Sequence, residues 1–397
     1  REVLRRRIPF HAVSESAYDV IVIGLGAMGS GSVYALTRPG TRPRRVLGID
    51  RFSPPHALGS SHGRTRIIRE AYFEHPSYVP LVRRAFDLWR ELERAIGRPL
   101  YTKTRGLTIG PDGGMLVKGA LEAAEQHHVP HRVLSAAGVH RYFPGLQPLD
   151  DMVGVVEERA GVLFPEQCIA AMLARAEQAG AELRRDEGVV SWEADDGGVL
   201  VRTTAGEYRA AQLVIAGGAW MARLVPELAG VLTVVRQPIH WFEPAAHPEE
   251  FSAAKCPVTL WEYAPNRVFY TLPDFGDGVK AGVHYEGRPV DPDHVERLTS
   301  ADEDAQATDL LRRFMPHAKG HLRESQVCLY TNTPDLHFVI DVHPMHAKRV
   351  VVVSACSGHG FKFATAIGEA VVDLLAGTAP KTDLSMFRLT RFTATER

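Results

Sequence analysis

The sequence is poor in several features that mark common classes of protein. Its formal net charge is −1, so no basic surplus favours nucleic acid or an anionic membrane as a partner. No apolar run reaches the roughly 20 residues that a membrane-spanning helix needs. The four cysteines follow neither a metal-ligand spacing nor a disulfide framework, which is typical of a reducing compartment. We therefore expect no nucleic acid, no membrane and no metal, and a cytoplasmic location.

What remains is the composition of an ordinary globular protein, with 45% hydrophobic and 23% charged residues. A chain of 397 residues is too long for one ordinary hydrophobic core and indicates about two domains. Residues 1–17 are basic and lack an apolar segment of signal-peptide length, so we expect them to form a flexible N-terminal extension.

A dinucleotide-binding pattern begins at residue 18. Residues 18–23 are a continuous apolar run, as in a strand buried on both faces of a parallel sheet. The segment Gly-Leu-Gly-Ala-Met-Gly follows at residues 24–29 and leads into a helical stretch, and residues 46–49 predict a second strand. This strand–helix–strand context turns a weak glycine pattern into a dinucleotide fingerprint.

Each glycine of such a fingerprint, and the acidic residue that follows, has a physical role. Gly24 permits the tight turn, Gly26 lets backbone N–H groups approach a pyrophosphate, and Gly29 lets the helix pack against the strand. The helix N-terminus then faces the phosphates with its positive end. Asp50 ends the second strand and is placed to accept hydrogen bonds from the adenosine ribose.

Hydrophobic periodicity predicts the remaining elements. Helices are expected over residues 81–92, 116–128, 165–180, 308–315 and 368–375. Strands are expected over residues 101–110, 189–192, 199–203, 213–216, 234–243, 258–262, 268–272, 279–284, 327–341 and 349–354. Pro238 cannot donate to a sheet, so part of its strand should be an edge or a bulge. An antiparallel pattern from residue 234 and a later return to buried strands indicate discontinuous domains.

Two polar segments near the C-terminus carry further information. Residues 328–335 read Cys-Leu-Tyr-Thr-Asn-Thr-Pro-Asp, and residues 357–363 read Ser-Gly-His-Gly-Phe-Lys-Phe. Taken alone, Cys328 is best interpreted as a buried structural thiol, because free cysteine packs as a small hydrophobe. Behind a dinucleotide fingerprint, however, the two segments resemble the flavin end of an amine oxidase.

Residues 61–69 (Ser-His-Gly-Arg-Thr-Arg-Ile-Ile-Arg) and 387–392 (Phe-Arg-Leu-Thr-Arg-Phe) complete the resemblance. Over residues 18–392 the chain resembles the monomeric sarcosine oxidase and N-methyltryptophan oxidase family, within the glycine and D-amino-acid oxidase fold group. The resemblance implies a monomer with FAD bound covalently through Cys328. It also implies that Ser61, Val189 and Gly360 join Gly24, Gly26, Gly29 and Asp50 in binding the cofactor.

The expected fold is α/β, with a discontinuous Rossmann-like FAD-binding domain and a second domain that has a mostly antiparallel sheet and flanking helices. The FAD-binding domain is expected to comprise residues 18–98, 153–228 and 325–397. The substrate domain is expected to comprise residues 99–152 and 229–324.

The resemblance also assigns residues to the substrate. Arg69 and Lys362 would hold its carboxylate, and Tyr270, His284, Tyr330 and the Gly358 carbonyl would line the site. A buried carboxylate needs cations, and arginine offers bidentate geometry. Two alternatives stay open at this point, namely that Arg69 forms a surface ion pair and that His284 is a packing or surface histidine.

Four further residues are assigned to the chemistry by the same resemblance. Arg66, His62 and Thr65 would lie near the flavin ring, and Lys280 would activate oxygen. A cation beside the flavin would stabilise superoxide as it forms, and this effect is larger in a dry site. The alternative for Lys280 is a solvated lysine at the start of a strand.

The chain departs from the family pattern at three places. Ser61 stands where bacterial members often have histidine, Arg64 stands where they often have aspartate, and the loop at residues 275–278 is one residue shorter than in sarcosine oxidase. These departures lie near the expected active site, so they bear on pocket size and substrate.

The predicted function is oxidation of a secondary amino acid by FAD, with sarcosine giving glycine and formaldehyde while O2 is reduced to hydrogen peroxide. The partners are a small amino-acid substrate and O2. Alternatives are a bulkier or cyclic substrate (N-methyltryptophan, pipecolate or proline) or a flavin-binding scaffold subunit without turnover. A nicotinamide dehydrogenase would share the glycine loop but would give no role to Cys328.

Overall fold

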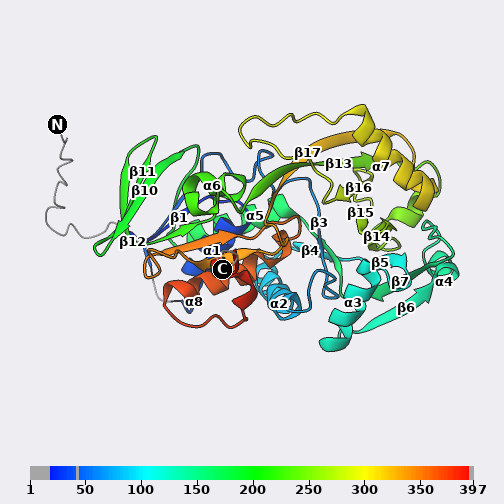
Figure 1. The fold of residues 1–397 in the computed structure, drawn as a ribbon, viewed down its shortest axis with the longest axis horizontal. Helices are drawn as coiled ribbons and strands as arrows, with labels where there is room; N and C mark the ends of the chain where they lie inside the picture. Colours follow the sequence, from blue (N-terminus) through cyan, green and yellow to red (C-terminus); the bar gives the residue numbers. More distant parts are fainter. Residues whose placement is uncertain (1–17, 42–43, 393–397) are drawn as a thin grey trace.

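The computed structural model describes residues 18–41 and 44–392, so the expected extension at residues 1–17 lies outside the described residues. Figure 1 shows two lobes side by side, each built around one large sheet. The α-helices of the described chain are α1 (Ala27–Thr37), α2 (Tyr78–Ile96), α3 (Met115–Gln126), α4 (Ala136–Tyr142), α5 (Pro165–Gln178), α6 (Met221–Leu224), α7 (Ala301–Phe314) and α8 (Ala364–Leu375).

The first lobe contains a mainly parallel sheet. Its strands are β1 (Tyr18–Ile23), β2 (Val46–Ile49), β9 (Glu182–Arg184), β10 (Val189–Asp195), β11 (Gly198–Thr203), β12 (Glu207–Ile215), β18 (Val339–Val342) and β19 (Val350–Ser354). The order is β10-β11-β12-β1-β2-β9, and β19 pairs with β12 and with β18. β9, β2, β1, β12 and β19 run parallel.

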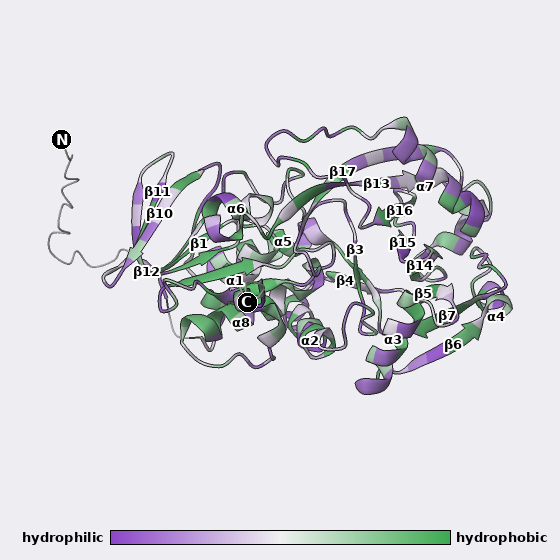
Figure 2. Cartoon of the chain, viewed as in Figure 1, coloured by the Kyte–Doolittle hydropathy of each residue, from purple (hydrophilic) through white to green (hydrophobic). Residues whose placement is uncertain are grey.

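The centre of this sheet is buried on both faces, as the apolar run at residues 18–23 predicts. Val20, Ile21 and Val22 are fully inaccessible. Figure 2 shows these central strands and α1 as a hydrophobic zone. α1, α2, α5 and α8 supply buried residues to the core on one face of the sheet. The Rossmann-like part of the predicted fold is therefore confirmed.

The second lobe contains a mostly antiparallel sheet. Its strands are β5 (Gly106–Pro111), β6 (His131–Ser135), β7 (Met152–Glu157), β13 (Thr233–Phe242), β14 (Val258–Ala264), β15 (Arg267–Leu272), β16 (Val279–His284) and β17 (Leu322–Asn332). The order is β17-β13-β16-β15-β14-β5-β7-β6, and the β14–β5 pair is parallel while the other pairs are antiparallel. α7 starts with a capping box between Ser300 and Glu303 and buries Leu311 and Phe314 against this sheet.

A small antiparallel sheet lies between the lobes and positions part of the site (Figure 1). It consists of β3 (Arg66–Ile68), β8 (Gly161–Leu163) and β4 (Tyr101–Lys103). Because β3 carries Arg66 and ends just before Arg69, both side chains are set by its pairing with β8.

Several predicted elements differ in their bounds. The single strand expected at residues 101–110 is broken into β4 and β5, because Arg105 between them adopts a φ of 68°. The strand expected at residues 327–341 is two strands, β17 and β18, separated by a turn in which Leu336 has a φ of 59°. Pro238 lies in β13, which is internal to its sheet. There it pairs with β17, whereas the pairing with β16 begins only at His240.

The chain passes from the first large sheet to the second and back twice, which supports the discontinuous domains that we propose. The proposed boundary at residue 325 falls inside β17, and the boundary at residue 153 falls inside β7. Within the described ranges, no helix combines the length and the apolar character needed to cross a membrane.

Candidate active site

The glycine loop between β1 and α1 forms one wall of a cavity of about 490 Å3. Gly24, Gly26, Asp50, Ser61 and Val189 all line this cavity. α1 begins after Gly26, which has no side chain to cap the helix. The backbone N–H of Ala27 donates to the Ser61 hydroxyl oxygen at 3.3 Å, and the positive end of the helix favours an anion here.

Two residues fix the shape of that loop. A β-carbon on Gly29 would lie 1.6 Å from the carbonyl oxygen of Gly24, so only glycine allows α1 to pack this closely. The Asp50 carboxylate accepts hydrogen bonds from the backbone N–H groups of Leu25 at 2.6 Å and Phe52 at 2.8 Å. Asp50 thus holds the loop and still borders the cavity.

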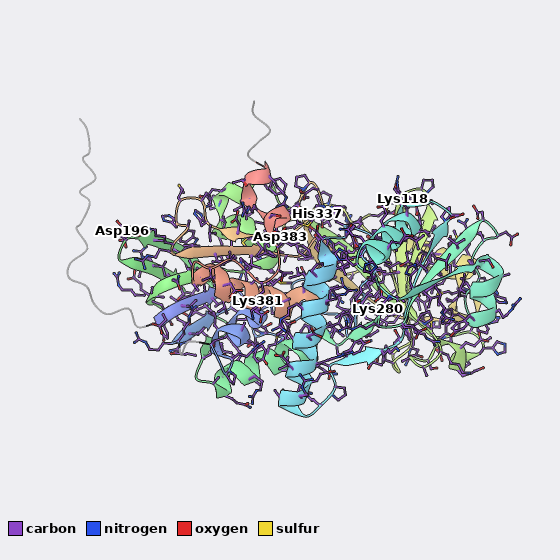
Figure 3. The ribbon with its side chains drawn as sticks, turned by 90° about the horizontal axis from the view of Figure 1, so that it is seen from below. Lys118, Asp196, Lys280, His337, Lys381 and Asp383 are labelled. Atoms are coloured by element: carbon purple, nitrogen blue, oxygen red, sulfur yellow. The ribbon has the colours of Figure 1, made fainter. Side chains whose placement is uncertain are left out.

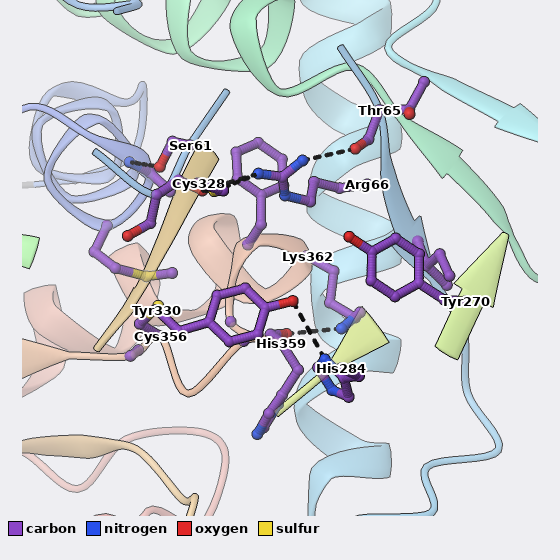
Figure 4. A pocket seen from close by; sticks show the side chains of 18 of the residues that line it. Ser61, Thr65, Arg66, Tyr270, His284, Cys328, Tyr330, Cys356, His359 and Lys362 are labelled. Carbon is purple, nitrogen blue, oxygen red and sulfur yellow. Dashed lines mark hydrogen bonds between the residues drawn. The ribbon is translucent and has the colours of Figure 1, made fainter. Parts of the chain in front are cut away.

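A second cavity of about 140 Å3 adjoins the first and shares Ser60, Ser61, Ala216 and Gly218 with it. Figure 4 shows that residues from both lobes converge on it. Its lining includes Thr65, Arg66, Arg69, Tyr270, Lys280, His284, Cys328, Tyr330, Gly358, Gly360 and Lys362. The structure therefore brings all of the expected site residues together except His62, which lines neither cavity, and Gly29, which lies beneath the loop.

The two adjoining cavities fit an elongated dinucleotide whose phosphates lie at the start of α1. The hydroxyl oxygens of Ser60 and Ser354 are buried in the second cavity and have no hydrogen-bond partner among the described residues. Buried polar groups are normally paired, so these hydroxyls indicate a missing polar ligand. The residues present fit FAD.

Cys328 lies on β17, lines the second cavity and is 2% exposed. The Arg66 guanidinium lies 3.4 Å from its sulfur and also donates to the carbonyl oxygen of Ser60. Burial raises the pKa of the thiol, but the charges of His62, Arg66 and Lys280 outweigh burial and lower the pKa to about 6. A cysteine with a low pKa beside cations is a nucleophile rather than an inert packing group.

Lys280 lies inside the molecule, on β16, whereas Lys118 and Asp196 lie at its periphery (Figure 3). It is 2% exposed, so the alternative of a solvated lysine is wrong. Its Nζ donates to the carbonyl oxygens of Gly63 at 2.7 Å and Thr65 at 2.9 Å. Burial and the neighbouring Arg66 charge hold the pKa of Lys280 well below its ordinary value.

Arg69 is 6% exposed, so it is not a surface residue. Its guanidinium forms a 2.6 Å ion pair with Glu74 and donates to the carbonyl oxygen of Ala71. The second carboxylate oxygen of Glu74, Oε1, is buried without a partner among the described residues, and Glu74 lines the cavity. Sequence reasoning missed Glu74, because an isolated glutamate carries no signal that distinguishes it from a surface residue.

Lys362 is the second buried cation of the cavity and is 5% exposed. Its Nζ donates to the carbonyl oxygen of His359 at 2.7 Å and to the hydroxyl of Tyr72 at 3.2 Å. Burial and the charge of Arg69 lower the pKa of Lys362 to about 7. An anion reaching the cavity would therefore meet Arg69 and Lys362 together.

His284 and two tyrosines also line the cavity. His284 Nδ1 lies 3.2 Å from the Tyr330 hydroxyl, and burial lowers the pKa of His284 to about 3, so this imidazole is neutral (Figure 4). Gly358 adopts a φ of 73°, and a β-carbon there would come within 2.5 Å of the Tyr330 ring. His284 faces the cavity rather than the surface.

The remaining expected residues lie around this arrangement. Thr65 lines the cavity and accepts, through its carbonyl oxygen, from Arg66 and Lys280. His62 is buried but lines neither cavity, and its Nδ1 lies 3.2 Å from the Gln326 side-chain oxygen. In the described ranges, no three His, Cys, Asp or Glu side chains converge to hold a metal ion.

Other residues of the segments that carry the family resemblance stabilise the fold and do not line the cavities. Asp335 forms a 2.7 Å ion pair with Arg391, which ties the cysteine-containing segment to the near-terminal one. Arg64 lines neither cavity; it forms ion pairs with Glu324 and Asp277 and lies over the Trp241 ring. Of the two side-chain departures from the family pattern, only Ser61 borders the cavities.

Comparison with known proteins identifies the family. Residues 19–374 match the family described as FAD dependent oxidoreductase (DAO). The chain belongs to that family. It is 41% identical over 365 residues to the monomeric sarcosine oxidase of Streptomyces avermitilis, covering 91% of this chain and 94% of that protein. It is 34% identical to the N-methyl-L-tryptophan oxidase of Salmonella heidelberg, covering 94% and 99%.

Solved structures agree with this assignment. The open form of NikD, an unusual amino acid oxidase essential for nikkomycin biosynthesis, has a TM-score of 0.81 at 25% identity, covering 94% of this chain and 97% of that one. Glycine oxidase from Geobacillus kaustophilus shares the fold, with a TM-score of 0.77 at 19% identity, covering 94% and 98%. The predicted fold class and the enzyme class, a flavin-dependent amine oxidase of the sarcosine oxidase type, are confirmed.

Proposed function

We propose that this protein is an FAD-dependent oxidase of small N-methyl amino acids, with sarcosine as substrate. The overall reaction consumes sarcosine, O2 and water and yields glycine, formaldehyde and hydrogen peroxide. The observation that carries the proposal is that two buried cations, Arg69 and Lys362, border the same cavity as Cys328. The similarity to sarcosine oxidases over nearly the whole chain supports the same substrate class.

The cofactor, when bound, supplies the acceptor for two electrons from the substrate C–N bond and later passes them to O2. The chain's own contribution is binding, orientation and charge. Arg69 and Lys362 would hold the carboxylate, because an unpaired buried carboxylate is costly. His284 is neutral and Tyr270, Tyr330 and the Gly358 carbonyl lie beside it, so this wall can accept a substrate amine without adding a like charge.

We assign Cys328 to covalent attachment of FAD. Its pKa of about 6 makes the thiolate available at neutral pH, and Arg66 stabilises negative charge beside it. Lys280 is assigned to the oxygen reaction, since its buried position near Arg66 and Cys328 is where a cation would act most strongly. We propose that the protein acts as a monomer, as the names of its sarcosine oxidase relatives suggest.

A second candidate is a bulkier N-methyl amino acid, and one observation favours it. The cavity is also bordered by the apolar side chains of Ile67, Phe73, Leu260 and Leu272. Such a wall could receive a side chain that sarcosine lacks, and N-methyl-L-tryptophan oxidases are among the relatives.

The test is peroxide release by the holoenzyme across a panel of sarcosine, N-methylalanine, N-methyltryptophan, pipecolate and proline. We expect the highest kcat/KM for sarcosine. A kcat/KM for N-methyltryptophan at least about tenfold above that for sarcosine would establish the bulkier class instead. Peroxide from none of them would contradict the function.

A further inference from the structure

Tyr72 lies behind the two cations that we assign to the substrate carboxylate. It follows β3 by four residues, is fully inaccessible and does not line the cavity. The Arg69 guanidinium lies 4.3 Å from the centroid of its ring, and the Lys362 ammonium lies 3.2 Å from its hydroxyl oxygen. One side chain therefore contacts both cations: its ring lies near Arg69 and, at 5.1 Å, near Lys362, while its hydroxyl contacts Lys362 alone.

The direction of the hydrogen bonds at Tyr72 follows from its next partner, His359. His359 Nε2 lies 3.1 Å from the carbonyl oxygen of Leu336, which can only accept, so Nε2 carries the proton. Burial and the Lys362 charge lower the pKa of His359 well below its ordinary value, so the ring is neutral and Nδ1 is an acceptor. The Tyr72 hydroxyl, 2.6 Å from Nδ1, therefore donates to His359.

This series of hydrogen bonds leaves the hydroxyl oxygen of Tyr72 free to accept a hydrogen bond from Lys362. With its proton committed to His359, the hydroxyl presents lone pairs to the ammonium. Lys362 then has one N–H group on Tyr72 and one on the His359 carbonyl oxygen, which leaves a third for a ligand in the cavity. The Lys362 backbone is itself held by a 2.8 Å hydrogen bond from Trp89 Nε1 to its carbonyl oxygen.

We propose that Tyr72, oriented by His359, is a positioning residue that aims the ammonium of Lys362 at the substrate carboxylate. The inference rests on the proposed function, in which Lys362 contacts that carboxylate. The affinity for carboxylates then depends on a hydroxyl that touches neither substrate nor cofactor.

The test uses the holoenzyme and acetate, whose binding is followed by the change in flavin absorbance. Tyr72→Phe keeps the ring over which Arg69 lies and removes only the hydroxyl. A hydrogen bond to a charged group is worth roughly 1.5–3 kcal/mol, so we expect the acetate Kd to rise about tenfold or more. The KM for sarcosine should rise in parallel, with kcat little changed.

Tyr78→Phe is the matched control. Tyr78 is equally inaccessible, and its ring lies 4.7 Å from the Tyr72 ring, but its hydroxyl is 3.1 Å from His337 Nδ1 and does not reach Lys362. It should lose similar thermal stability while leaving the acetate Kd unchanged. An equal rise of the Kd in both variants would overturn the inference, because it would show a general packing effect.

Lys362→Met, alone and with Tyr72→Phe, separates this inference from the proposed function. We expect Tyr72→Phe to have no further effect on the acetate Kd once Lys362 is methionine, since residues that act as a unit are not additive. An undiminished tenfold effect in that background would overturn the role of Tyr72 and leave the carboxylate contact of Lys362 intact. If Lys362→Met itself left acetate affinity unchanged, the proposed carboxylate contact would be wrong.

His359→Leu provides a second route if Tyr72→Phe does not accumulate as holoenzyme. Without the Nδ1 acceptor, the Tyr72 hydroxyl loses its fixed direction, so we expect the acetate Kd to rise about threefold, and again only when Lys362 is present. An unchanged Kd in His359→Leu holoenzyme would overturn the orienting role of His359.

Discussion

The Arg66 guanidinium lies 3.4 Å from the sulfur of Cys328, and both side chains line the second cavity. This contact joins β3, in the small central sheet, to β17 of the second large sheet. It places a permanent positive charge beside a thiol whose pKa is lowered to about 6, and so defines a reactive position among four otherwise unremarkable cysteines.

We predict that FAD is attached to Cys328. Acid-precipitated holoprotein should remain yellow, and the flavin-bearing peptide should contain Cys328. Cys328→Ser should release all of its FAD under acid. Cys356→Ser is the matched control, because Cys356 also lines the cavity but burial raises the pKa of its thiol. Retention of flavin by Cys328→Ser after acid precipitation would refute attachment through Cys328.

Arg69→Ala should lower kcat/KM for sarcosine by about 30-fold or more, since removing one partner of a buried charge pair costs roughly 2–5 kcal/mol. Acetate affinity should fall in parallel, as measured by flavin absorbance. Arg83→Ala is the control: its ion pair with Glu70 is partly exposed and should contribute little. If Arg69→Ala bound acetate as tightly as the unchanged protein, the carboxylate assignment would fail.

Lys280→Met should separate the two half-reactions. We expect the reaction of the reduced enzyme with O2 to slow about 100-fold, the scale of losing one preorganised electrostatic contact. Anaerobic reduction by substrate should change much less, because the carboxylate is held by other residues. Stopped-flow absorbance measures both rates, and Lys280→Arg, which keeps the charge, should retain more of the oxygen reaction. Equal slowing of both half-reactions would indicate general damage to the site.

Carboxylate binding should weaken as the pH rises above about 7, the pKa to which burial and Arg69 lower Lys362. The protonated ammonium binds the anion, so the acetate Kd should change little below this pKa and increase by up to about tenfold per pH unit above it, where the neutral amine dominates. His284, with a pKa lowered to about 3 by burial, stays neutral throughout this range.

Glu157 is another titratable group near this cation pair. Burial raises the pKa of Glu157 to about 7, and its carboxylate accepts from the backbone N–H groups of Glu70 and Ala71 beside Arg69. Measuring the acetate Kd against pH in Lys362→Met distinguishes Lys362 from Glu157. The dependence should vanish in that variant, and its persistence would assign the titration to Glu157 instead.

The sequence predicted the elements whose signal is local. The apolar run at β1, the glycine loop and Asp50 give a dinucleotide site because each residue acts within one strand–helix–strand unit. The amphipathic helix α2 was recognisable from its buried stripe, and it ends where Gly97 adopts a φ of 69°. The break at Arg105 was not predictable, because it depends on a residue other than glycine adopting a left-handed conformation.

The sequence predicts a residue of the candidate site only where that residue belongs to a recognisable motif. Arg69 and Lys362 were identified through recognisable stretches, but their immediate partners Glu74 and Tyr72 are ordinary residues whose role arises from contacts made in space. His62 belongs to the same stretch as Arg69 but lines neither cavity, and β17 brings the Gln326 side-chain oxygen to 3.2 Å from its Nδ1. Its place near the flavin ring stays a prediction.

Oxidation of an N-methyl amino acid with O2 as electron acceptor can be checked by the product balance of the purified holoenzyme with sarcosine. O2 consumption, hydrogen peroxide and formaldehyde should be measured in the same reaction. We expect one peroxide and one formaldehyde for each O2 consumed. Sarcosine-dependent flavin reduction without peroxide, or peroxide without formaldehyde, would contradict it.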